Sequence, residues 1–103
     1  MKDKVKDITQ RVVDLLKQEL NPERIILFGS RAKGSAKPYS DIDIAIEGGK
    51  TLDYRERRKL REKIEGISGI YSFDLIFLDS VEDDFAEIIK KTGRVLYEKG
   101  RSA

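Results

Sequence analysis

Residues 24–47, RIILFGSRAKGSAKPYSDIDIAIE, decide the fold of this chain. They begin with a short apolar run over residues 24–28, which predicts a buried strand. They end with a strict alternation of acidic and aliphatic side chains over residues 41–47, which predicts a second strand with one face toward the core. Residues 29–40 between them are polar, carry two glycines and a proline, and predict a loop with room for one helical turn.

Helical and strand patterns flank this segment on both sides. Apolar residues at three- and four-residue steps predict an amphipathic helix over residues 3–20, which ends before Pro22 because the residue preceding a proline avoids helical geometry. Residues 53–66 predict a heavily charged helix. Residues 73–78 predict an apolar strand, which we expect in the centre of the sheet because both of its faces are apolar except at Asp74.

The last part of the chain predicts one more helix and one more strand. Residues 80–83 resemble a capping box, so we expect a helix from there to about Lys91. Its inward side chains are predicted to be Phe85, Ile88 and Ile89. Residues 94–98 predict an edge strand, and we expect residues 99–103 to fray.

This order of elements predicts one domain over residues 1–103. The expected fold class is α/β (α+β), a small mixed sheet of three or four strands flanked by helices. No internal repeat or linker interrupts the pattern.

Composition excludes several function classes. The 103 residues include 21 basic and 19 acidic side chains, for a net charge of +2, which argues against a broad attraction to nucleic acid or anionic lipid. The absence of cysteine and histidine excludes disulfides, thiolate or histidine metal sites and a Ser-His-Asp triad. No apolar run approaches ~18 residues and the N-terminus has no apolar signal core, so we expect no membrane span and a cytoplasmic location.

The first site signal is Gly29-Ser30 directly after the first strand. A glycine lets the backbone approach a ligand closely, and a helical turn beginning near Ser30 would point free N–H groups at an anion. An ordinary turn after a strand is the alternative.

The second signal is Asp41-Ile42-Asp43. Residues two apart on a strand face the same way, about 6.6 Å apart at roughly 3.3 Å per residue, so both carboxylates project together. Paired carboxylates are suited to hard divalent cations. The solvated face of an edge strand is the alternative.

The third signal is Asp74, which interrupts an otherwise apolar run. A carboxylate is costly to bury unless it is paired, hydrogen-bonded or bound to metal. A salt bridge to an arginine or a helix cap would explain it without a function.

These three signals, in this order, resemble the nucleotidyltransferase superfamily that includes DNA polymerase beta. The sequence of residues 29–34 and 40–43, together with the short length of the chain, resembles the minimal nucleotidyltransferase (MNT) branch of this superfamily in particular. The motifs span residues 24–78.

The resemblance implies the transfer of a nucleoside monophosphate, expected to be AMP from ATP, to a hydroxyl group. It implies that Asp41, Asp43 and Asp74 bind two Mg²⁺ ions. It also implies that Gly29 and Ser30 hold the phosphates of the nucleoside triphosphate, and we expect Arg31 to assist as a point charge.

The resemblance further implies a helical HEPN-domain protein as partner, with the MNT chain as the antitoxin that adenylylates a tyrosine of the HEPN toxin. Two other functions stay open. The chain could be a non-catalytic partner-binding antitoxin or scaffold with a vestigial site. Six basic residues within 55–63 leave a nucleic-acid-binding module as the third, weaker reading, and a homodimer is also plausible.

Overall fold

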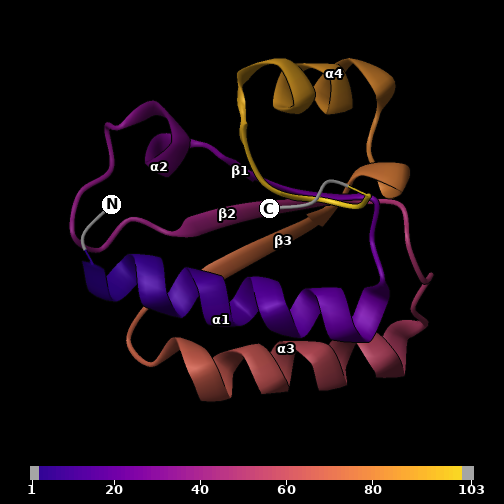
Figure 1. Cartoon of the computed structure of the whole chain (residues 1–103), viewed down its shortest axis with the longest axis horizontal. Helices are drawn as coiled ribbons and strands as arrows, with labels where there is room; N and C mark the ends of the chain where they lie inside the picture. Colours follow the sequence, from indigo (N-terminus) through magenta and orange to yellow (C-terminus); the bar gives the residue numbers. More distant parts are fainter. Residues whose placement is uncertain (1–2, 101–103) are drawn as a thin grey trace.

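The computed structural model describes residues 3–100, and its elements follow the predicted order (Figure 1). The elements are α1 Asp3–Leu20, β1 Arg24–Phe28, α2 Ser30–Lys33, β2 Ile42–Glu47, α3 Tyr54–Ser68, β3 Phe73–Phe77, the 3-10 helix η1 Leu78–Ser80, α4 Asp83–Thr92 and β4 Arg94–Glu98. The expected α/β (α+β) class is therefore confirmed.

The four strands form one mixed sheet in the order β3-β2-β1-β4. Strand β1 is antiparallel to both of its neighbours, whereas β2 and β3 run parallel. The register places Phe28 of β1 beside Asp43 of β2, and Asp43 beside Asp74 of β3. Three strands therefore contribute neighbouring positions at one end of the sheet.

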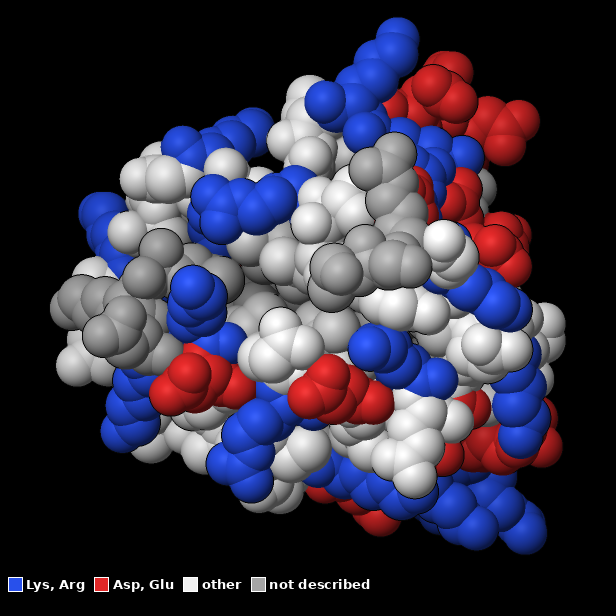
Figure 2. Space-filling model, viewed as in Figure 1, with Lys and Arg blue, Asp and Glu red and all other residues white. Residues whose placement is uncertain are grey.

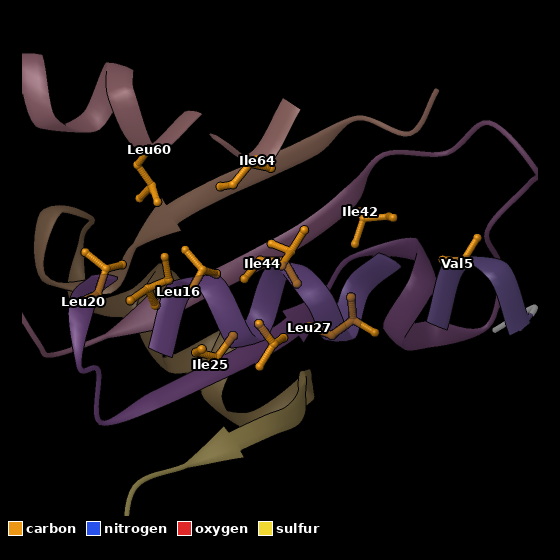
Figure 3. Packing of buried hydrophobic residues seen from close by; sticks show 12 residues of the cluster. Val5, Leu16, Leu20, Ile25, Leu27, Ile42, Ile44, Leu60 and Ile64 are labelled. Carbon is orange, nitrogen blue, oxygen red and sulfur yellow. The ribbon is translucent and has the colours of Figure 1, made fainter. Parts of the chain in front are cut away.

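Helices cover both faces of the sheet, but unequally. Helices α1 and α3 lie side by side on one face, and the shorter α4 lies on the other (Figure 1). Aliphatic side chains from the larger layer and from alternate positions of β1 and β2 form the main core (Figure 3). Its labelled members are Val5, Leu16, Leu20, Ile25, Leu27, Ile42, Ile44, Leu60 and Ile64.

Local sequence sets the ends of the two long helices. Asn21 adopts a left-handed conformation (φ 47°) and ends α1 just before Pro22. At the start of α3, the side chain of Asp53 accepts a hydrogen bond from the Glu56 N–H (2.8 Å), and the Glu56 side chain accepts one from the Asp53 N–H (3.1 Å). This reciprocal capping box fixes the first turn of α3.

The expectation that residues 73–78 form a central strand is wrong. Within the described residues 3–100, strand β3 lies at one edge of the sheet and pairs with β2 only. Phe73, Leu75 and Phe77 pack toward α1 and α3, whereas Asp74 on the other face is exposed. The apolar residues of this run lie on the face of β3 that α1 and α3 cover. The other face carries the exposed Asp74.

Two expectations about α4 are also wrong. The side chains of Phe85 and Ile88 are exposed, at 41% and 57%, and Ala86 and Ile89 are the buried members of this helix. The capping box expected from Ser80 is absent, since Ser80 belongs to η1 and the N-cap residue Glu82 makes no capping bond with its side chain. The 3-10 turn delays the start of the helix.

The edge position of β4 is confirmed. The expected fraying of residues 99–103 falls in part on 101–103, which lie outside the described residues. No helix within residues 3–100 combines the length and the apolar character needed to cross a lipid bilayer.

The burial pattern leads to a stability prediction for two isoleucines. We expect Ile44→Ala to lower the free energy of unfolding by about 2–5 kcal/mol, because Ile44 is fully buried on β2 and its removal leaves a cavity. The same truncation at the exposed Ile88 should change it by less than about 0.5 kcal/mol. Urea denaturation followed by circular dichroism measures both, and equal losses would contradict this assignment of the core.

Candidate active site

The start of β2 carries the first two acidic residues. Asp43 lies on β2 and Asp41 directly precedes it. Ile42 and Ile44 are fully buried on the face of α1 and α3, so the side chain of Asp43 projects from the opposite face. Ala45, two residues further along, packs on the α4 side, which confirms this orientation.

Asp74 joins these two residues from the neighbouring strand. Its Cα is paired with that of Asp43 in the parallel ladder, so both side chains project from the same face of the sheet. Asp43 is half-buried, while Asp41 and Asp74 are exposed. The structure thus brings the three predicted acidic residues together at the open end of the α4 face, and no sealed apolar interior surrounds them.

The electrostatics of Asp43 reflect this crowding. Partial burial raises the pKa of its carboxyl group above the ordinary value of 3.8, and the negative charges of Asp74 and then Asp41 raise it further. Three like charges are therefore close enough to interact. A bound cation would relieve their repulsion.

The donor chemistry suits a hard divalent cation, because all three side chains offer carboxylate oxygens. These side chains lie further apart than the ligands of a metal centre do. Within residues 3–100, no three acidic side chains converge closely enough to form a metal-binding group. Metal binding by Asp41, Asp43 and Asp74 stays a prediction.

Gly29 lies against the same carboxylate. Its φ of 74° falls in the left-handed region, and a β-carbon at this position would collide with Oδ2 of Asp43. The glycine is therefore required by two constraints, the backbone turn and the space taken by Asp43. The second constraint was not foreseen in the sequence, because it depends on the β1–β2 register.

Ser30 begins the single helical turn α2, as expected. The Gly29 carbonyl accepts a hydrogen bond from the Lys33 N–H (3.2 Å), and the Ser30 carbonyl accepts one from the Ser35 N–H (3.0 Å). These bonds close the turn at the end of β1. Phosphate binding by Gly29 and Ser30 stays a prediction.

Arg31 has a structural task that the sequence did not reveal. Its side chain is buried, and Nη2 donates hydrogen bonds to the carbonyls of Ser40 (2.9 Å), Pro38 (3.4 Å) and Lys37 (3.5 Å). These carbonyls belong to the loop that leads directly into Asp41. The guanidinium thus holds that loop against α2, and its predicted role toward phosphate stays untested.

Sequence comparisons assign the chain to a family. The family model described as polymerase beta, nucleotidyltransferase matches residues 10–102. A Haemophilus influenzae protein named "Probable protein adenylyltransferase MntA" is 37% identical over 92 residues, covering 88% of this chain and 81% of that protein. The Methanocaldococcus jannaschii protein MJ1215, named as a candidate protein adenylyltransferase, is 36% identical over 77 residues, covering 75% and 88%.

Solved structures agree with the sequence comparisons. A chain of a toxin–antitoxin crystal structure with AMP-PNP matches with a TM-score of 0.74 and 28% identity, covering 88% of this chain and 73% of that one. A chain from the Shewanella oneidensis complex of a tri-AMPylated HEPN toxin with its MNT antitoxin matches with a TM-score of 0.68 and 25% identity, covering 91% and 72%. The chain belongs to the polymerase beta nucleotidyltransferase family and is a nucleotidyltransferase of its minimal (MNT) branch.

Proposed function

We propose that this chain transfers AMP from ATP to a hydroxyl group of a partner protein, and that it is the antitoxin of a HEPN/MNT pair. The observation that carries the proposal is the cluster of Asp41, Asp43 and Asp74 beside Gly29. A relative named as a protein adenylyltransferase and a neighbour seen with a tri-AMPylated HEPN toxin support it.

The reaction needs charge neutralisation and positioning more than covalent chemistry from the protein. The acceptor oxygen attacks the α-phosphorus of ATP, a new P–O bond forms, the bond to the bridging oxygen of pyrophosphate breaks, and the hydroxyl proton is lost to solvent. Two Mg²⁺ ions held by Asp41, Asp43 and Asp74 would neutralise the triphosphate and acidify the acceptor hydroxyl. A chain without histidine can therefore support this chemistry.

The other residues of the site have separate tasks in this proposal. The turn at Gly29 and Ser30 receives the β- and γ-phosphates, close to Asp43. Arg31 keeps the loop before Asp41 in place through the Ser40 carbonyl. The basic residues of α3 do not favour a nucleic-acid module, because Lys63 pairs with Glu19 of α1 and the net charge of the chain is only +2. Figure 2 shows acidic side chains among the basic ones on the face in view.

Removing the two acidic residues at the start of β2, Asp41 and Asp43, tests catalysis. We expect Asp41→Asn, Asp43→Asn to lower the labelling of a HEPN partner by [α-³²P]ATP and Mg²⁺ at least about a hundredfold, since losing a single preorganised electrostatic contact can cost that much. The double variant Asp14→Asn, Asp84→Asn makes the same charge change at exposed positions and should label normally. Toxin neutralisation by the folded Asp41→Asn, Asp43→Asn protein without ATP would favour a non-catalytic antitoxin instead.

Gly29 provides a test of the site geometry with a matched control. Both Gly29→Ala and Gly34→Ala place a side chain at a positive φ, and Gly29, with ψ −154° against 11° at Gly34, carries the greater backbone strain. Only the β-carbon at position 29 also collides with Asp43. We expect Gly29→Ala to transfer AMP roughly a hundredfold more slowly than Gly34→Ala, because a displacement of about 1 Å can cost that factor. Equal rates would show that the Gly29–Asp43 contact does not matter for catalysis.

The pKa of Asp43 gives a third test. We expect Asp74→Asn to lower this pKa by removing a like charge, while leaving it above 3.8 because partial burial remains. Since the ionised form is the one that binds cations, wild-type activity should fall as the pH drops through the raised pKa. Carboxyl ¹³C NMR titration of both proteins, with and without Mg²⁺, measures the pKa of Asp43. An unchanged pKa in Asp74→Asn would show that the charge of Asp74 does not act on Asp43.

A further inference from the structure

The outer edge of β3 is open. Within residues 3–100, this strand pairs with β2 alone, and the Ile42 N–H donates to the Ser72 carbonyl at 2.9 Å. Main-chain groups of alternate residues on a strand point to the same side. Those of Phe73, Leu75 and Phe77 therefore point away from β2, where a further extended segment can bind them.

A groove of about 720 Å³ runs along this edge, between β3 and α3. Phe73, Leu75 and Phe77 line one of its walls, and Leu60 and Ile64 of α3 contribute to the other. Asp74 also borders the groove, so the groove meets the candidate active site at the edge of the sheet.

Charged residues on α3 give the groove a direction. Arg57, Arg61 and Glu65 recur at four-residue spacing and form one row along its rim. The Arg57 guanidinium lies 4.6 Å from the ring centroid of Phe77, so the positive end of the row is at the C-terminal end of β3. Glu65, two turns further along α3, marks the other end.

Strand geometry connects this groove to the chemistry. In a segment added to β3, the residue opposite Asp74 would project from the same face as Asp74 and Asp43. Its two neighbours would project from the other face, into the groove. The residue that receives AMP and the residues that recognise α3 would therefore alternate along one extended segment.

We propose that the β3 edge and the α3 groove form the docking site for the acceptor segment of the partner protein. The segment binds as an added strand, with a hydroxyl side chain opposite Asp74. Acidic side chains one and three residues away, opposite Leu75 and Phe77, contact Arg61 and Arg57. This inference rests on the proposed function for the identity of the acceptor, but the docking itself requires neither ATP nor metal.

Binding of designed peptides, measured without nucleotide, tests the register. One nine-residue probe has a central tyrosine, glutamates one and three residues after it, and threonine elsewhere. Its control has the same composition with the glutamates two and four residues after the tyrosine. A second pair places the glutamates before the tyrosine, which covers the opposite strand direction.

We expect one of the two alternating peptides to bind roughly threefold to tenfold more tightly than its shifted control, the size that one or two partly exposed ion pairs give. It should also slow amide hydrogen exchange at Leu75 and Phe77, because their N–H groups become hydrogen-bonded. Isothermal titration and exchange measured by NMR report these two effects separately.

Charge-reversal variants localise the contact. Arg61→Glu and Arg57→Glu should remove the preference for the alternating peptide. Arg58→Glu makes the same change on α3 outside the groove and should keep it. Circular dichroism checks that all three variants fold, and Arg61→Glu stays informative if loss of the Arg57–Phe77 contact destabilises the other variant.

Three results of the peptide measurements would overturn the proposal: equal binding within both peptide pairs, no saturable binding of any peptide, and exchange protection confined to β4 or α4. A dimer of this chain that dissociates in Arg57→Glu would assign the edge to a second copy and would also overturn it. Because no step uses ATP, a failure here leaves the AMP-transfer proposal intact, and inactive AMP transfer leaves the docking result intact.

Discussion

The pairing of β2 with β1 and β3 is the constraint on which the rest of the molecule depends. Burying Ile42 and Ile44 against α1 and α3 forces Asp43 to project from the other face, because side chains alternate along a strand. The parallel register then places Asp74 beside it. The same backbone geometry that stabilises the core therefore also holds like charges close together.

The segment between β1 and β2 protects this arrangement. Gly29 leaves room for the Asp43 carboxylate, where any larger residue would displace it. Arg31 donates to three backbone carbonyls of the loop, those of Lys37, Pro38 and Ser40, so the chain enters β2 in a defined position. Both residues act on the acids through geometry.

The unequal covering of the sheet determines where a partner can approach. Helix α4 packs on Ile26 and Ala45, and its Phe85 ring meets Phe28 edge to face at 6.4 Å, but Asp41 and Asp74 stay exposed. On the other face, α3 lies far enough from β3 to leave a groove beside its open edge. The acidic residues and the groove meet at Asp74, so in the proposed reaction the nucleotide and the acceptor would approach this point from different sides.

Local periodicity and backbone preference were enough to predict the order of elements, the strand alternation of residues 41–47 and the turn at Gly29-Ser30. The same reading singled out all three acidic residues. Three features became visible only in the folded chain: β3 is an edge strand, Phe85 and Ile88 are exposed, and Arg31 braces the loop before Asp41. Those outcomes depend on which strands pair and how far each helix reaches, and residues distant along the chain set both.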